Sequence, residues 1–75
     1  MKYIFVDESW EDYLYWQKTN KKILKRINEI LKDIARNPQS GIGKPERLKY
    51  KYKGFWSRRI DQEHRLIYRV KDDEI

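Results

Sequence analysis

Hydrophobic residues recur at two different spacings along this chain of 75 residues, and the spacing changes near its middle. Between residues 23 and 34 the apolar positions follow the period of an α-helix, and charged or amide side chains fill the other positions. The members of this apolar stripe are Ile23, Leu24, Ile27, Ile30, Leu31 and Ile34. The pattern predicts an amphipathic helix that packs its stripe into the core and turns its lysines to solvent. Asn37 and Pro38 should end it.

The segment before this helix predicts a short strand followed by a first helix. Lys2–Val6 is apolar and β-prone, and it leads into four acids between residues 7 and 12, which favour the first turns of a helix. Ser9, with Asp12 three residues later, is a candidate N-terminal cap. Thr19 and Asn20 should end this helix, and they can cap the next one.

After a loop over residues 39–45 that delivers Glu46 to the sheet, the spacing of the apolar positions becomes two. The apolar residues that alternate with lysines are Leu48, Tyr50 and Tyr52. This alternation predicts a strand from Arg47 to residue 53 with one buried face and one basic face. Gly54 should then turn the chain.

Two further strands are predicted at Phe55–Ile60 and His64–Val70, on either side of a short polar turn. If the residues that flank this turn pair, Arg59 lies opposite Arg65 on one face of the sheet. The opposite face would carry Trp56, Ile60, Leu66 and Tyr68. Directly opposed like charges destabilise a sheet, so a bound anion would relieve this pair. The alternatives are a register that slips by one residue, or neutralisation by the two acids of the turn.

Together these elements define an α+β fold in a single domain over residues 1–75, with an N-terminal strand and two helices packed on a twisted antiparallel sheet. Ile75 is typical of the first residue of another strand, so the last strand is expected to be missing or truncated. The chain has no cysteine and one histidine, which argues against a zinc site, and no metal or cofactor is expected. Its N-terminal apolar run is too short for a signal peptide or a membrane span, so we expect a soluble, intracellular protein.

Positive charge is concentrated in the half of the chain that forms strands. Residues 44–69 hold nine of the 18 Lys and Arg against three acids, so this window carries +6, which equals the net charge of the whole chain. Cations interleaved with aromatic residues are typical of surfaces that bind RNA or DNA. A solvated basic face is the simpler interpretation. The aromatic residues of the sheet should be mainly core, with one or two at the edge of the basic face free to hold a base.

Glu46 is the acid that lies at the start of this basic region. RNA carries its own nucleophile, the 2'-hydroxyl, so a protein can cleave RNA without metal by removing that proton, stabilising the phosphate and protonating the leaving oxygen. Glu46 suits the first role, and Arg59 and Arg65 suit the second, because a guanidinium offers paired donors to phosphate oxygens. No residue suits the third role. Alternatively, Glu46 is only a charge partner in a basic loop.

Several segments occur in an order and spacing that resemble a known family. They are Glu8-Ser9-Trp10-Glu11-Asp12-Tyr13, Tyr15-Trp16-Gln17, Gly43-Lys44-Pro45-Glu46, Leu48-Lys49, Trp56-Ser57-Arg58-Arg59-Ile60 and Glu63-His64-Arg65-Leu66-Ile67-Tyr68. The family is YoeB (Txe), among the RelE-type ribonuclease toxins of bacterial toxin–antitoxin pairs, and the resemblance covers all 75 residues. It implies a cytoplasmic toxin with a RelE-like fold that enters the ribosomal A site, cuts mRNA there and inhibits translation. It also implies inhibition by an acidic antitoxin, operator DNA bound through the antitoxin complex, and a monomer or homodimer.

The resemblance also implies roles for individual residues. In YoeB-like toxins the glutamate matching Glu46 is the general base, and the arginine matching Arg65 stabilises the transition state. The candidate substrate-binding residues are Lys44, Lys49, Arg58 and Arg59. His64 matches a framework position, whereas the family's catalytic histidine belongs to a terminal His-Tyr pair.

That terminal pair is absent here, because the chain stops at Ile75. Either the chain is shortened or the toxin is degenerate. The alternative to an endoribonuclease is therefore a catalytically weak module that binds antitoxin, ribosome or nucleic acid without efficient cleavage. A third interpretation is a plain basic RNA binder, in which each Lys or Arg contributes about equally.

Overall fold

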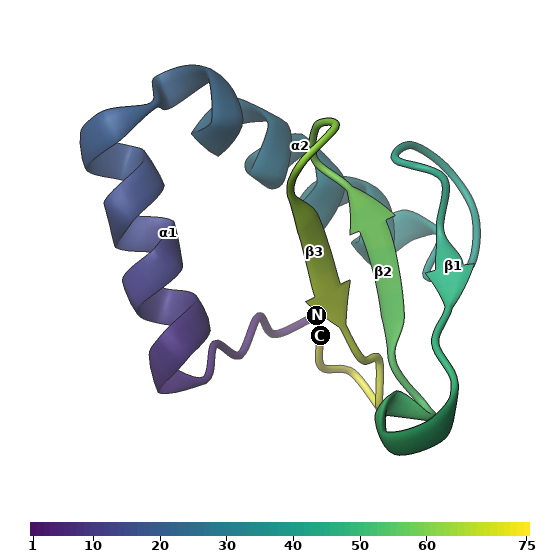
Figure 1. Ribbon diagram of the computed structural model, residues 1–75. Coiled ribbons are helices and arrows are strands. Elements are labelled where there is room, and N and C mark those ends of the chain that lie inside the picture. The colour runs from purple at the N-terminus through teal and green to yellow at the C-terminus, as the bar shows by residue number, and fades with distance from the viewer.

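The computed structural model describes residues 1–75 and consists of two helices and a three-stranded antiparallel sheet (Figure 1). The elements are α1 (Asp7–Thr19), α2 (Lys21–Arg36), β1 (Glu46–Arg47), the 3₁₀ helix η1 (Tyr50–Tyr52), β2 (Trp56–Arg59) and β3 (Arg65–Tyr68). The strands lie in the order β1-β2-β3. In Figure 1, α2 passes behind the sheet, whereas α1 stands to one side of it, beyond β3. The predicted α+β class, with helices on an antiparallel sheet, is confirmed.

The two helices begin in different ways. α1 begins at Asp7 without a side-chain cap, and the Ser9 hydroxyl, already inside the first turn, donates to the Val6 carbonyl. The prediction that Ser9 caps this helix was therefore wrong, because the helix begins two residues earlier. α2 has the predicted cap, since the Asn20 side chain accepts hydrogen bonds from the backbone N–H groups of Lys22 and Ile23.

The core lies between α2 and the sheet. Ile30 and Ile34 of α2 are fully buried and cluster with Tyr68 of β3, and Ile27 is also buried. Partly buried side chains that pack against this cluster are Trp56, Ile60, Leu66, Val70 and Ile75. α1 buries no residue. The predicted stripe of α2 is thus confirmed at its centre, and the inner face of β2 and β3 supplies the other side of the core.

The predicted register of β2 and β3 is confirmed. Arg59 lies opposite Arg65, and the Ile60 N–H donates to the His64 carbonyl across the polar turn. Because side chains alternate between the faces of a sheet, Arg58 points inward toward α2 and Arg59 points outward. This alternation explains why Arg58 is buried whereas its neighbour Arg59 is exposed.

The strand predicted over residues 47–53 was wrong beyond its first residue. Arg47 pairs with Trp56, and the Leu48 N–H donates to the Phe55 carbonyl, so the chain must reverse direction within residues 49–54. Those six residues contain Lys49, η1 and the turn after it, and a reversal leaves no room for a strand. Tyr50, expected on a buried face, is 92% exposed instead.

The N-terminal segment is extended and runs beside the C-terminal residues. The Lys2 N–H donates to the Asp73 carbonyl, and the Lys2 carbonyl accepts from the Ile75 N–H, both at 2.8 Å, in a parallel bridge. The expected N-terminal strand is thus reduced to an isolated bridge outside the main sheet. This pairing brings the two ends of the chain together (Figure 1).

Candidate active site on the outer face of the sheet

The strand register gathers polar side chains on the face of the sheet that points away from α2. Glu46 of β1 lies opposite Ser57 of β2, and Arg59 of β2 lies opposite Arg65 of β3. Ser57 and Arg59 are two residues apart, so their side chains share one face. The sheet therefore places a carboxylate, a hydroxyl and two guanidinium groups on one surface.

Glu46 and Arg65 form an ion pair on this face, with 2.9 Å between Arg65 Nη2 and Glu46 Oε2. The Nε of Arg65 also donates to the Ser57 hydroxyl at 3.1 Å, so its guanidinium is held at two points. The ion pair is open to solvent, with side-chain exposures of 38% for Arg65 and 67% for Glu46. The structure thus brings the two predicted catalytic side chains into direct contact on an accessible surface.

Ser57 is a residue of this site that sequence reasoning missed. The residue is 2% exposed, although it lies on the outer face, and its hydroxyl accepts the hydrogen bond from Arg65. It was overlooked because serine carries no charge and its hydroxyl suggested no chemical role. The alternation that puts Arg59 outward also puts Ser57 outward, and that signal was present in the sequence.

Arg59 and Lys44 line a shallow hollow of ≈ 290 Å³ between the loop that precedes β1, the end of β2 and α2. Its complete lining is Arg26, Gly43, Lys44, Arg59, Ile60, Asp61 and Gln62. Three cations face one acid there, so the hollow favours an anion. Gly43 is fixed against β2, since its carbonyl accepts the Arg59 N–H at 2.7 Å, and its φ of 79° suits glycine.

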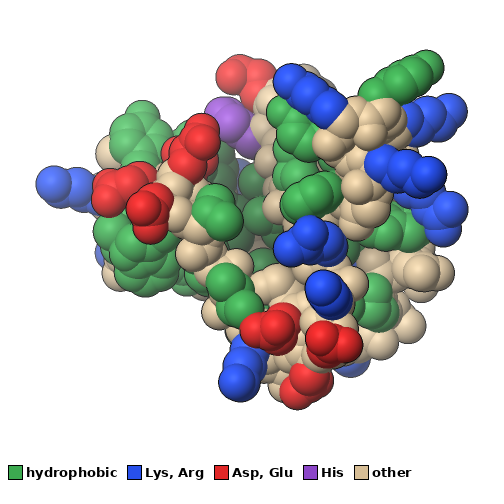
Figure 2. Space-filling model, turned by 90° about the horizontal axis from the view of Figure 1, so that it is seen from below, with side chains coloured by type: hydrophobic (Ala, Val, Ile, Leu, Met, Phe, Trp, Pro, Cys, Tyr) green, Lys and Arg blue, Asp and Glu red, His purple; other side chains and the backbone are tan.

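Lys49 lies outside this hollow, on the exposed reversal between β1 and β2. Its carbonyl accepts the Tyr52 N–H, and its side chain is free in solvent. Figure 2 shows that most Lys and Arg side chains visible from below lie over the sheet, whereas one group of acids lies over α1. The cationic half of the sequence thus becomes a cationic side of the molecule.

Arg58 requires a correction, because the structure does not place it among the substrate-binding residues. Its side chain is fully buried under α2 and forms an ion pair with Asp33, with 2.6 Å between Arg58 Nη1 and Asp33 Oδ2. Its other acceptors are the Tyr68 hydroxyl and the carbonyls of Asn37, Ser40 and Ile42. All five N–H groups are therefore occupied by the protein. Arg58 stabilises the loop that precedes β1 instead of contacting a ligand.

Hydrogen bonds lower the pKa of Asp33 in this network. The Arg58 side chain is the main cause, and the Ile42 N–H, which donates to Oδ2 at 3.0 Å, is the next. Asp33 therefore stays ionised in acid where an ordinary aspartate would begin to protonate. Sequence reasoning missed this partner, because it lies 25 residues from Arg58.

His64 lies on the inner side of the sheet, away from the Glu46–Arg65 pair. Its ring meets Trp16 of α1 edge to face at 4.9 Å between centroids, and its Nδ1 is 3.1 Å from Asp61 Oδ1. The backbone N–H of His64 is the main cause that lowers the pKa of Asp61. His64 thus joins α1 to the β2–β3 turn, as expected of a framework residue.

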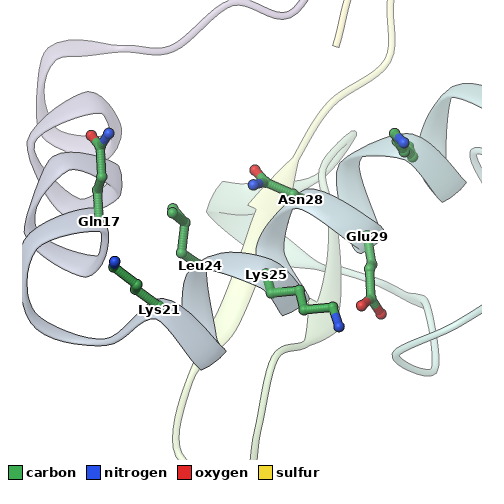
Figure 3. A pocket seen from close by; sticks show the side chains of 7 residues that line it. Gln17, Lys21, Leu24, Lys25, Asn28 and Glu29 are labelled. Atoms are coloured by element: carbon green, nitrogen blue, oxygen red, sulfur yellow. The ribbon is translucent and has the colours of Figure 1, made fainter.

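Another hollow, of ≈ 530 Å³, lies between the two helices rather than at the outer face of the sheet. Figure 3 shows Gln17 on α1 and the other labelled residues on α2, where the Lys25 and Glu29 side chains point away from Gln17. Only one of its seven lining residues is hydrophobic. This open hollow lacks the convergent polar groups of a catalytic site.

The structure contains neither a cluster of metal-binding side chains nor a helix suited to cross a membrane. No three side chains among His, Cys, Asp and Glu converge as metal ligands would. No helix combines the length and the apolar character needed to cross a membrane.

Solved structures with the same architecture define the class of this protein. It matches the heterotetrameric YoeB–YefM toxin–antitoxin complex from Staphylococcus aureus with a TM-score of 0.94 and 49% identity, over 99% of this chain and 86% of that one. It matches the YoeB/ParE toxin from Agrobacterium tumefaciens with a TM-score of 0.95 and 44% identity, over 96% of this chain and 84% of that one. The class is therefore that of the bacterial toxin–antitoxin toxins.

Sequence comparison narrows this class to one family. The family of YoeB-like toxins of bacterial type II toxin–antitoxin systems matches residues 5–75. The chain is 61% identical to the toxin YoeB of Escherichia coli strain CFT073 and 49% identical to that of Streptomyces coelicolor. Each comparison covers 100% of this chain and 89% of the relative. The chain belongs to the YoeB-like toxin family, as its motifs predicted.

Proposed function

We propose that this toxin is a ribosome-dependent endoribonuclease that cuts mRNA in the A site by metal-independent attack of the 2'-hydroxyl. The observation that carries the proposal is the contact between Glu46 and Arg65 on an exposed, cationic face. A base and a phosphate-binding group within one ion pair are two of the three parts that this reaction needs. Family membership supports the same assignment.

The geometry suggests how the pair works. Ser57 holds Arg65 at Nε, which leaves its terminal nitrogens to bind a phosphate oxygen in place of the Glu46 carboxylate. A phosphate that takes over the guanidinium frees Glu46 to accept the proton of the 2'-hydroxyl. Arg59 of β2 lies directly opposite Arg65 of β3 and adds a second cation for the same phosphate.

Cleavage of a defined mRNA in a reconstituted translation system, mapped by primer extension, tests the proposal. Glu46→Gln keeps the shape of the side chain but removes the base, so it should lower the cleavage rate by about 10²-fold to 10⁴-fold. Arg65→Lys keeps the charge but loses the paired donors, and it should cost about 10²-fold to 10³-fold. Glu63→Gln, at an exposed acid of the β2–β3 turn, is the matched control and should cut normally. Cleavage that ignores both site variants, or that proceeds equally without ribosomes, would refute the proposal.

A second candidate function is binding without efficient cleavage. The observation that favours it is the position of His64, which contacts Trp16 and Asp61 on the other side of the sheet from Glu46. From there His64 does not donate a proton to the leaving oxygen of an RNA bound at Glu46. In that case the unaltered chain and Glu46→Gln should bind ribosomes equally tightly in a sedimentation assay. Both should also cut the mRNA equally slowly.

The partners follow from the same family. A YoeB relative from Staphylococcus aureus was solved in complex with YefM, and another as a dimer. We propose that this chain acts in the cytoplasm, binds an acidic antitoxin through its cationic side, reaches operator DNA through that complex, and is a monomer or homodimer when free. Binding of the antitoxin should weaken steeply as salt is raised, because screening acts on exposed charges.

A further inference from the structure

Tyr50 is more exposed than the other large hydrophobic side chains, at 92% of its surface. It lies at the start of η1, in the reversal between β1 and β2. Single apolar residues on a surface are common and by themselves indicate nothing. Three further features distinguish this one: its backbone conformation, the charge around it, and its distance from Glu46.

The backbone holds Tyr50 in a conformation that disfavours an L-residue. Its φ is 58°, in the left-handed region that costs free energy for residues with a Cβ. The flanking hydrogen bonds fix this conformation, since the Tyr52 N–H donates to the Lys49 carbonyl and the Lys53 N–H donates to the Tyr50 carbonyl. The ring gains no packing from it. The reversal therefore presents a phenol ring to solvent on a defined backbone.

The segment around Tyr50 is purely cationic. Lys49, Lys51 and Lys53 are all exposed, and no acid occurs between Arg47 and Ile60. Alternation of lysines with an exposed aromatic ring is the arrangement that binds single-stranded nucleic acid, with phosphates on the cations and a base on the ring.

We infer that the Tyr50 ring is a stacking platform for one base of a single-stranded RNA whose phosphates bind Lys49 and Lys51. Tyr50 lies four positions after Glu46 in the chain, so their Cα atoms are at most roughly 14 Å apart. This is close enough for one strand to reach both. The inference deepens the proposed RNA cleavage and depends on it for the identity of the ligand.

An acidic peptide would also be attracted to the lysines, but it would make no use of the ring. An apolar peptide side chain needs a pocket, whereas both faces of a ring that is 92% exposed are open to solvent. Every nucleobase has a flat π-face that fits such a ring without a pocket. The observations therefore favour a nucleic acid.

Fluorescence anisotropy with a 2'-O-methyl oligoadenylate of about 12 nucleotides tests this inference, because that probe lacks the nucleophile and cannot be cleaved. Tyr50→Ala should weaken its binding by about 5-fold to 150-fold, and Tyr50→Trp should restore it. An abasic oligomer of equal length should bind wild type and Tyr50→Ala equally. Lys51→Ala, in contrast, should lower the slope of log K against log salt by about 0.7, whereas Tyr50→Ala should leave the slope unchanged.

Tyr15→Ala is the matched control, because Tyr15 is 57% exposed on α1, away from the cationic segment. It should bind the oligoadenylate as wild type does. The inference is overturned if Tyr50→Ala binds the oligoadenylate as tightly as wild type does, or if it loses as much affinity for the abasic oligomer as for the oligoadenylate. It is also overturned if Tyr50→Ala weakens only the binding of polyglutamate, a model of an acidic peptide. The Glu46→Gln cleavage assay decides the proposed reaction separately, so either result can fail without the other.

Discussion

The two faces of the sheet each carry an arginine–carboxylate pair, and the two pairs differ in their exposure to solvent. On the inner face, Arg58 and Asp33 meet at 2.6 Å, and the arginine is fully buried. On the outer face, Arg65 and Glu46 meet at 2.9 Å with both side chains open to solvent. A buried charge is tolerated only when every donor is occupied, and Arg58 meets that condition. An exposed pair separates at little cost, because water replaces each partner, so it can exchange a carboxylate for a phosphate.

The largest expected effect on stability comes from breaking the inner pair. Arg58→Ala leaves Asp33 and four other acceptors without their donor, and it should lower the free energy of unfolding by about 3–5 kcal/mol. Arg65→Ala removes the same side chain from the outer face and should cost about 0–1 kcal/mol. Urea denaturation followed by circular dichroism measures both. Equal losses in the two variants would show that burial does not separate these pairs.

The next effect concerns the loop that the inner pair fixes, and two glycines test it. A Cβ at Gly41, where φ is 119°, would lie 1.9 Å from Asp33 Oδ2, so Gly41→Ala must displace the carboxylate that Arg58 binds. We expect a loss of roughly 2–4 kcal/mol. Gly54→Ala is the control, because its φ of 95° is also strained but its Cβ meets nothing within 4 Å. That variant should lose about 1 kcal/mol in the same denaturation experiment. Similar losses would mean that strain alone, and not Asp33, matters at Gly41.

A pH titration of stability tests the inner Arg58–Asp33 pair in another way. Because its pKa is lowered in the folded state, chiefly by the hydrogen bond from Arg58, Asp33 binds a proton more readily when the chain is unfolded. Its contribution is therefore present above the ordinary aspartate pKa of about 3.9 and is lost as pH falls through the lower folded value. Thermal midpoints of Asp33→Asn and wild type should differ most near neutral pH and converge in acid.

Asp72→Asn is the control for that titration, because Asp72 is exposed in a turn at a positive φ that asparagine also adopts. Its midpoint should follow the wild-type curve at every pH. Asp61, whose pKa is also lowered, remains in all three proteins and so cancels from the comparison. A constant difference between Asp33→Asn and wild type down to the lowest pH would contradict the assignment.

The sequence predicted the parts of this molecule that depend on near neighbours. The stripe of α2, the Asn20 cap and the β2–β3 register follow from spacings of a few residues, and the structure contains them. The pairing of Arg47 with Trp56, which forces the reversal at Tyr50, depends on contacts between strands that local alternation does not encode. An alternating run of lysine and tyrosine therefore suggested a strand where the chain turns.

The candidate site was predictable in its charged members and not in their environments. Glu46, Arg59 and Arg65 stand out as charged residues on three neighbouring strands, and they share one face. Arg58 stood out equally, yet alternation with Trp56 already indicated that it points inward. Its role became clear only with Asp33, because a partner on α2 is fixed by how the helix crosses the sheet.

The smallest expected effect tests the like charges that remain on the outer face. Arg59 and Arg65 lie directly opposite each other, and only the latter has a carboxylate partner. Arg59→Gln should raise the free energy of unfolding by up to about 0.5 kcal/mol at low salt, because it removes this repulsion. The gain should vanish near 1 M salt, where the screening length falls to about 3 Å. Lys32→Gln on α2 makes the same change in net charge without an opposed cation, so a gain of equal size there would assign the effect to net charge. A gain in stability confined to Arg59→Gln means that the outer face holds an uncompensated cation. An uncompensated cation favours the binding of a phosphate, whereas the Arg58–Asp33 pair beneath α2 is already balanced.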